Sequence, residues 1–338
     1  GHSNVQGIGS VGFTPQLKKV ILENLESRFP VTLPSDSGLD TLACMEAAHL
    51  GKFEFAWNLG GNLYGSNPDS KFATDALSQI DFTLYLNTTL NQGHFLGRGK
   101  TTLILPVAAR DEEPEPTTQE SMFSFIRLSE GGPARYFGPR SEIKIISEIA
   151  EKVLSNDPLP WDKFGKTKNT RQLISEVIPG FDALKNIDKM GKEFHIKGRT
   201  LHNSEFPVSG GKANFKVCPI PAVRKNSQNQ FILMTVRSEG QFNTVVYDTE
   251  DRYRGISGRN VVLMNKNDMT ALGLSENCRV TVKNTTGTMS GQRAVAYPIK
   301  EGNIMMYYPE SNILVPRNSD PQSKTPSFKS IEVILEKE

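Results

Sequence analysis

The first half of the chain contains a strand, a loop, a helix and a second strand in close succession. Residues 53–57 (FEFAW) and 81–86 (DFTLYL) each have the apolar pattern of a strand, and residues 69–80 between them have helical spacing. Two such strands within about 30 residues predict a βαβ unit with parallel pairing and a right-handed crossover. Parallel sheets bind ligands at the carboxyl ends of their strands. The loops 58–67 and 87–99, which follow the two strands, are therefore candidate binding loops.

Other parts of the first 225 residues have weaker patterns, apart from one clear helix. Residues 141–154 place their apolar side chains on one helical face. Residues 1–13 are rich in glycine, which predicts a loop. From 156 to 225 the signals weaken, and this stretch is interpreted as a connector with short helices.

The last third of the chain changes character. Six short apolar runs, separated by turn clusters, have the length and composition of strands: 231–236, 261–264, 279–283, 293–297, 303–308 and 331–335. Many short strands with little helix are typical of a small closed barrel. The pattern thus predicts an α/β domain followed by a mostly β barrel domain.

Composition narrows the function mainly by exclusion. The length of 338 residues predicts roughly two domains. Lys and Arg number 39 against 37 Asp and Glu, and the net charge of +2 is too small to predict a nucleic acid or a membrane surface as partner. No apolar run approaches the roughly 20 residues of a membrane span. Cys44, Cys218 and Cys278 form no CxxC pair, which argues against a disulfide scaffold, a zinc ribbon or a self-contained iron–sulfur site.

Motifs for a nucleophile or a metal site are absent from the sequence. The five histidines have no metal-ligand spacing, and GxSxG, HExxH and DxDxDG do not occur. We therefore expect no catalytic and no metal-ligating residue within this chain. The chain opens without an initiator Met and without a signal peptide, so we expect a processed or truncated piece of a cytoplasmic protein, with a periplasmic location left open.

The polar loops each allow two interpretations. The loop 58–69 (NLGGNLYGSNPD) could bind an anion at a helix start, or it could be an ordinary βα turn. The loop 87–98 could hold a polar ligand or simply be solvated. Residues 237–243 (RSEGQFN) and 251–259 (DRYRGISGR) could bind phosphate through arginine forks, or they could be charged surface loops. Local chemistry alone supports a two-domain ligand-binding protein.

Seven stretches, taken together and in order, carry a more specific resemblance. They are GHSNVQG (1–7), LGGNLYGSNPD (59–69), TTLNQGHFLGRGKTTLILPVAARDE (88–112), SGGKANF (209–215), MTVRSEGQFNTVVYDTEDRYRGISGRNVVLMN (234–265), YYPESN (307–312) and DPQSKTPSFKSIEV (320–333). The chain resembles the C-terminal half of molybdopterin-dependent oxidoreductases of the dimethyl-sulfoxide-reductase superfamily. Within that superfamily it is most similar to the formate-dehydrogenase-like alpha subunits.

The resemblance implies a fold and a cofactor. In that family a bis(molybdopterin guanine dinucleotide) with molybdenum or tungsten is held between four domains. The resemblance implies a partial Rossmann-like α/β domain over 1–175, a connector over 176–225 and a molybdopterin dinucleotide-binding double-psi β-barrel over 226–338. Asn, Gln, Ser and Thr side chains suit the amide-like edges of pterin and guanine, while Arg and Lys suit the pyrophosphate.

The resemblance also implies which residues contact the cofactor. They are Asn4, Gln6, Gly60, Gly61, Asn62, Asn87, Thr88, Thr89, Asn91, His94, Arg237, Ser238, Glu239, Gln241, Asn243, Thr244, Asn312, Phe328 and Lys329. Residues 7–10 (GIGS) depart from the more charged stretch that relatives often have there, which leaves the active-site contacts and the substrate open.

The family's N-terminal half, with any 4Fe-4S cluster and any Cys or selenocysteine ligand to the metal, has no counterpart in this chain. We therefore expect a two-electron oxidoreductase only as part of a longer chain, acting on a small molecule such as formate and on an electron acceptor. The fragment alone is expected to be inactive and could self-associate through exposed apolar surface. One alternative is a non-catalytic cofactor- or partner-binding module. A second is a nucleotide-binding α/β protein with an unrelated barrel, although the absence of GxGxxG and P-loop motifs argues against it.

Overall fold

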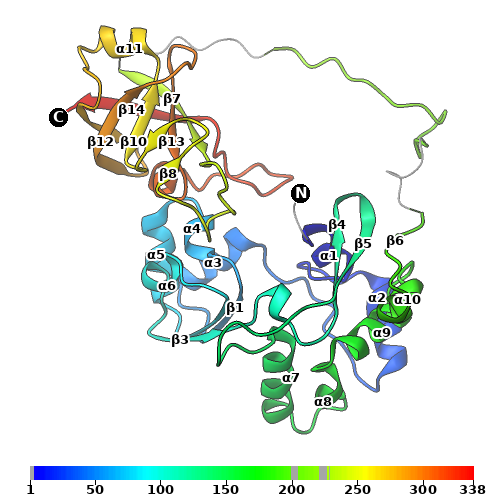
Figure 1. The fold of residues 1–338 in the computed structure, drawn as a ribbon. Helices are drawn as coiled ribbons and strands as arrows, with labels where there is room; N and C mark the ends of the chain where they lie inside the picture. Colours follow the sequence, from blue (N-terminus) through cyan, green and yellow to red (C-terminus); the bar gives the residue numbers. More distant parts are fainter. Residues whose placement is uncertain (1–3, 199–204, 221–226, 228) are drawn as a thin grey trace. The chain divides into compact units, whose positions relative to one another are not determined.

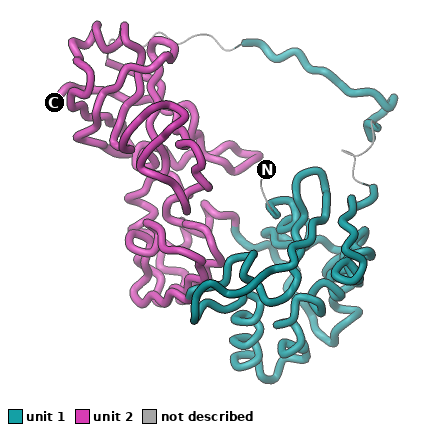
Figure 2. Tube along the Cα trace, viewed as in Figure 1, with its two compact units in different colours: residues 1–39, 106–220 teal, residues 40–105, 221–338 magenta. Residues whose placement is uncertain are grey.

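The computed structural model describes residues 4–198, 205–220, 227 and 229–338. The chain divides into two compact units, residues 1–39 with 106–220 and residues 40–105 with 221–338, which Figure 2 colours separately. These units group residues 40–105 with the barrel region, whereas the predicted domain boundaries lie at 175 and 225; those boundaries stay a prediction. In the described part of the chain, no helix is both long enough and apolar enough to cross a membrane.

The first unit is mainly helical with one small sheet (Figure 1). Its elements are α1 (Val5–Ser10), α2 (Lys19–Arg28), η1 (Arg110–Glu112), β4 (Thr117–Ser121), η2 (Met122–Ser124), β5 (Phe125–Ser129), α7 (Glu142–Val153), α8 (Trp161–Phe164), α9 (Thr167–Val177), η3 (Asp182–Asn186), α10 (Ile187–Met190) and β6 (Phe194–His195). Strands β4, β5 and β6 pair antiparallel in that order. The helix expected at 141–154 is α7.

Two parts of this unit differ from the sequence-based expectation. The glycine-rich start is not all loop, because α1 forms there and packs against β4. The side-chain Oδ1 of Asn4 accepts a hydrogen bond from the backbone N–H of Glu120 at 3.0 Å, a tertiary contact that local glycine content does not report. Part of the expected connector also belongs to a core: Val177, Phe181 and Ile196 are buried in one hydrophobic cluster with Ile21.

The second unit begins with the βαβ arrangement. Its elements up to the barrel are α3 (Thr41–His49), β1 (Phe55–Leu59), α4 (Leu63–Ser66), α5 (Ser70–Ser78), β2 (Phe82–Asn87), α6 (Gly93–Leu96) and β3 (Thr101–Pro106). Strands β1 and β2 pair in parallel, with Trp57 opposite Leu84, in a sheet of order β1-β2-β3. Met45 of α3 and Leu77 of α5 share a buried cluster. The predicted parallel βαβ unit is confirmed, and both candidate loops lie at the carboxyl ends of its strands.

The rest of the second unit is built around a closed barrel. Its elements are β7 (Gln230–Val236), β8 (Glu250–Asp251), β9 (Ile256–Ser257), β10 (Val261–Met264), α11 (Lys266–Ala271), β11 (Arg279–Lys283), β12 (Thr288–Ala296), β13 (Asn303–Tyr307), η5 (Glu310–Leu314) and β14 (Ile331–Lys337). The barrel order is β10-β12-β11-β14-β7-β13, with parallel pairs β10–β12 and β7–β13. These six strands are the six that the sequence predicted.

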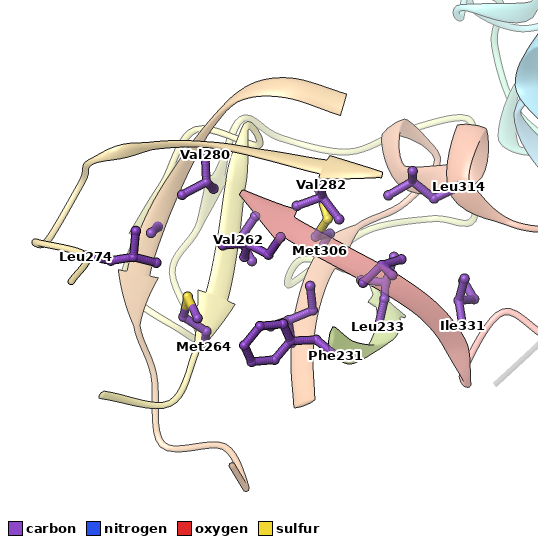
Figure 3. Close-up of a cluster of buried hydrophobic side chains, with 14 of the residues drawn as sticks. Phe231, Leu233, Val262, Met264, Leu274, Val280, Val282, Met306, Leu314 and Ile331 are labelled. Carbon is purple, nitrogen blue, oxygen red and sulfur yellow. The ribbon is translucent and has the colours of Figure 1, made fainter. Parts of the chain in front are cut away.

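The barrel interior explains why those short runs form strands. Leu233, Val262, Val280 and Met306 are fully or almost fully buried and come from four different strands, as Figure 3 shows. Alternate residues along β7 point into this core and away from it, which is the period-2 pattern of a half-buried strand. The core therefore fixes the end of β7, from which the loop 237–244 continues.

Candidate functional site

The glycine-rich loop after β1 has a backbone that only glycine adopts readily. Gly60 and Gly61 have φ values of +66° and +74°, and a Cβ at either position would meet no atom within 4 Å. The requirement for glycine is thus conformational, and the space beside the backbone is open. Asn87, at the end of β2, and Asn91 each donate a side-chain hydrogen bond to the Gly61 carbonyl, at 3.1 and 2.9 Å. The structure therefore brings the two candidate loops together at Gly61.

His94 and Asn87 leave buried polar atoms without a partner at this place. The Nδ1 of His94 accepts the backbone N–H of Asn91 at 2.9 Å, so the neutral ring carries its proton on Nε2. That Nε2 and the Oδ1 of Asn87 are buried and make no hydrogen bond. An unpaired buried donor or acceptor costs about 1–3 kcal/mol. Polar groups that accept from His94 Nε2 and donate to Asn87 Oδ1 would remove this cost, so the residues present fit a polar ligand.

Burial also makes His94 sensitive to pH. Desolvation lowers the pKa of His94 below its ordinary value of about 6.5. As the pH falls through 6.5, the unfolded chain binds the proton first, so the free energy of unfolding should fall. We expect a His94→Gln variant to lose less stability than the wild type between pH 7.5 and 5.5 in urea titrations. Parallel losses in both proteins would contradict this expectation.

The barrel side of the site is the loop 237–244. Ser238 and Gln241 are buried: the Ser238 N–H donates to Gln241 Oε1 at 3.0 Å, and Gln241 Nε2 donates to the carbonyls of Asn243 and Tyr308, both at 2.8 Å. Asn243 has a positive φ of 52° and accepts the Tyr308 hydroxyl at 2.7 Å. Hydrogen bonds within the loop thus fix its conformation. Ser238 and Gln241 lie on the buried side of the loop, and Asn243 is exposed.

Two cations, Arg237 on this loop and Lys329 just before β14, have no carboxylate partner among the described residues. Arg237 lies 5.6 Å from the Tyr308 ring, and its Nη2 lies 3.5 Å from Asn243 Oδ1. Lys329 donates through Nζ to the Thr235 carbonyl, and burial together with the nearby Arg237 lowers its pKa. Within the described residues, neither cation forms an ion pair. Two adjacent positive charges without a carboxylate are a favourable place for an anion.

Several predicted contact residues are instead engaged within the protein. Asn62 Nδ2 donates to the Thr244 carbonyl at 2.9 Å, and the fully buried Asn312 donates to the carbonyls of Gly65 and Asn67 at 2.8 and 3.1 Å. These bonds join the loop after β1 to the barrel inside one compact unit. The geometry gives them a joining role, and their contact with a cofactor stays a prediction.

The remaining predicted residues have simple surroundings. Thr88, Thr89 and Glu239 are exposed, while Phe328 packs against the barrel core and its carbonyl accepts the Thr235 N–H at 3.1 Å. Gln6, in the other compact unit, accepts the Ser124 N–H at 3.2 Å, as Asn4 accepts that of Glu120. Across the described ranges, no group of three His, Cys, Asp or Glu side chains is placed to hold a metal ion.

Two of the three arginines in the stretch 251–259 form ion pairs within the protein, and a phosphate contact of this stretch stays a prediction. Arg254 pairs with Asp251 at 2.6 Å, and Arg259 pairs with Glu310 at 2.6 Å. From the sequence, Arg259 was considered only as part of this stretch, and its ion pair was not predicted. Its partner lies 51 residues away, so no local spacing could have indicated the pair.

Comparison with known proteins indicates the class to which this chain is similar. Residues 231–332, which include most of the barrel, match the family model of the molydopterin dinucleotide binding domain. The whole chain resembles an uncharacterized oxidoreductase of Mycobacterium tuberculosis, with 34% identity over 99% of this chain and 45% of that protein. It is 31% identical to protein YdeP of Escherichia coli over 99% of this chain and 46% of that protein. The chain therefore spans about half the length of these relatives.

More distant similarities are found in sequence to one protein and in fold to another. A formate dehydrogenase subunit alpha of Methanocaldococcus jannaschii is 24% identical over the whole chain and 52% of that protein. Acetylene hydratase from Pelobacter acetylenicus has a similar fold, with a TM-score of 0.63 and 15% identity over 98% of this chain and 50% of its own. Residues 231–332 therefore carry a molybdopterin dinucleotide-binding domain, and the chain is related to oxidoreductases, a formate dehydrogenase alpha subunit among them. The resemblance indicated by its motifs is confirmed.

Proposed function

We propose that this chain is the C-terminal cofactor-binding part of a molybdenum- or tungsten-dependent oxidoreductase, similar to formate dehydrogenase alpha subunits. The observation that carries the proposal is the unneutralised pair Arg237 and Lys329, which lies within the matched dinucleotide-binding domain. The orphaned polar atoms of Asn87 and His94 support it, because they need a ligand with both donors and acceptors.

Each group of residues has a task in this proposal. Arg237 and Lys329 hold the negatively charged pyrophosphate of the dinucleotide, and the bent backbone at Gly60 and Gly61 allows close approach of a phosphate or ring. Asn87 and His94 orient a polar ring edge by hydrogen bonds. The bound molybdenum or tungsten would supply the two-electron redox chemistry; the protein binds and orients the cofactor.

The finer parts of the proposal rest on the family resemblance. We assign the parallel βαβ unit to a Rossmann-like domain, and we assign the barrel, with its two parallel strand pairs, to the double-psi type. A 4Fe-4S cluster would belong to a preceding part of the polypeptide. Formate is the first substrate to screen, together with an electron acceptor in the cytoplasm, and this chain without its preceding part is expected to be inactive.

The test is the cofactor content of the natural full-length polypeptide, produced in a host that makes the cofactor. We expect about one molybdenum or tungsten and about two guanine nucleotides per chain, by elemental analysis and acid release, as a bis-dinucleotide cofactor requires. Neither metal nor nucleotide would overturn the proposal and favour a non-catalytic binding module.

A further inference from the structure

Arg259 connects three segments that surround the proposed cofactor loop. It lies in the short segment between β9 and β10, and its side chain is only 7% exposed. Its Nε and Nη2 donate to the two carboxylate oxygens of Glu310, at 2.6 and 3.0 Å. The same guanidinium donates to Ser238 Oγ at 3.0 Å, to Gln241 Oε1 at 3.3 Å and to the Tyr308 carbonyl at 2.8 Å. One side chain thus binds the loop 237–244 to η5 and the end of β13.

Two aromatic rings fix the orientation of the Arg259 guanidinium. The Arg259 Cζ lies 4.2 Å from the centre of the Tyr247 ring and 5.0 Å from that of Tyr307. A planar cation over aromatic faces is fixed in orientation as well as in position. The donors toward Ser238 and Gln241 therefore point in set directions.

The conformation of the loop 237–244 depends on Gln241, one of the residues that accept a hydrogen bond from Arg259. Gln241 Oε1 accepts from both Arg259 and the Ser238 N–H, while Gln241 Nε2 donates to the Asn243 carbonyl. The Gln241 side chain thus holds the loop together through these hydrogen bonds, and Arg259 fixes the position of its Oε1. Arg237 and Asn243, at the two ends of the braced segment, are exposed.

We propose that Arg259 is a positioning residue for the proposed dinucleotide site, acting through Ser238 and Gln241 on the conformation of the loop 237–244. The inference rests on the proposed function. The inference adds that residue 259 must carry a planar guanidinium. A lysine could pair with Glu310, but a single ammonium cannot also reach Ser238, Gln241 and Tyr308 in the same geometry.

The experiment compares Arg259→Lys with wild type in the natural full-length polypeptide, produced with the cofactor. Arg293→Lys is the matched control, because Arg293 lies in the same barrel but bonds Asn277 and Ser257 instead of this loop. Three quantities are measured: hydrogen exchange of the amides in 237–244, guanine nucleotide per chain, and the thermal midpoint. Charged hydrogen bonds are each worth about tenfold or more in an equilibrium constant, so exchange should rise and nucleotide content fall by at least about tenfold in Arg259→Lys. The thermal midpoint of Arg259→Lys should fall, because charged hydrogen bonds of a buried side chain are lost, whereas all values of the control should stay near wild type.

Wild-type exchange and nucleotide content in Arg259→Lys would overturn the proposal, because the residue would then be only half of an ion pair. If Arg259→Lys does not fold, Glu310→Gln is tested in its place, because this variant keeps the hydrogen bonds of Arg259 to Ser238, Gln241 and Tyr308. That variant should retain its nucleotide, and loss from the folded variant would overturn the proposal. A wild type without metal or nucleotide would instead refute the proposed function, and the exchange data alone would then decide whether Arg259 positions the loop.

Discussion

Replacing Arg237 and Lys329 together by Gln should reduce retention of the guanine dinucleotide by about a hundredfold or more, because each charged hydrogen bond contributes about 1.5–3 kcal/mol. The two cations lie close enough for Arg237 to lower the pKa of Lys329, and neither has a carboxylate partner among the described residues. The pyrophosphate of the dinucleotide would be the counterion that both cations share. Guanine nucleotide per chain after exhaustive dialysis of the full-length protein measures the effect.

The same variant should behave differently without the cofactor. Removing two like charges relieves their repulsion, so the free energy of unfolding of the cofactor-free protein should not fall. The matched control is Lys283→Gln with Arg293→Gln, which removes two cations from the same barrel, of which Lys283 is already paired with Glu336 at 2.6 Å. Equal nucleotide retention in the two double variants would show that Arg237 and Lys329 do not form the anion site.

The sequence predicted best those elements whose cause is local. The strands β1, β2 and all six barrel strands have apolar runs of the right length, and each is bounded by turn residues. The helix α1 was missed because Gly7 and Gly9 lie within it, and a contact with β4 outweighs their low helix propensity.

The candidate site was predictable only in part. The meeting of Asn87 and Asn91 at Gly61 follows from parallel pairing, which places the ends of neighbouring strands at one edge. The bond from Asn62 to Thr244 joins residues 182 positions apart, and no spacing rule connects them. The ion pair between Arg259 and Glu310, which are 51 positions apart, was missed for the same reason. The cofactor itself came from the resemblance of several motifs, because no single loop distinguishes a dinucleotide site from a polar turn.

Leu233→Ala should lower the free energy of unfolding by about 2–5 kcal/mol, the range for a leucine removed from a packed core. Leu233 has no exposed surface and lies among Phe231, Val262 and Met306 in the barrel interior. Its neighbour Met234, on the opposite face of β7, is 37% exposed, so Met234→Ala is the matched control and should cost about 1 kcal/mol or less. Urea unfolding of both variants measures the difference. Similar losses would mean that β7 does not alternate between core and surface, and the anchoring of the loop 237–244 by that strand would then fail as well.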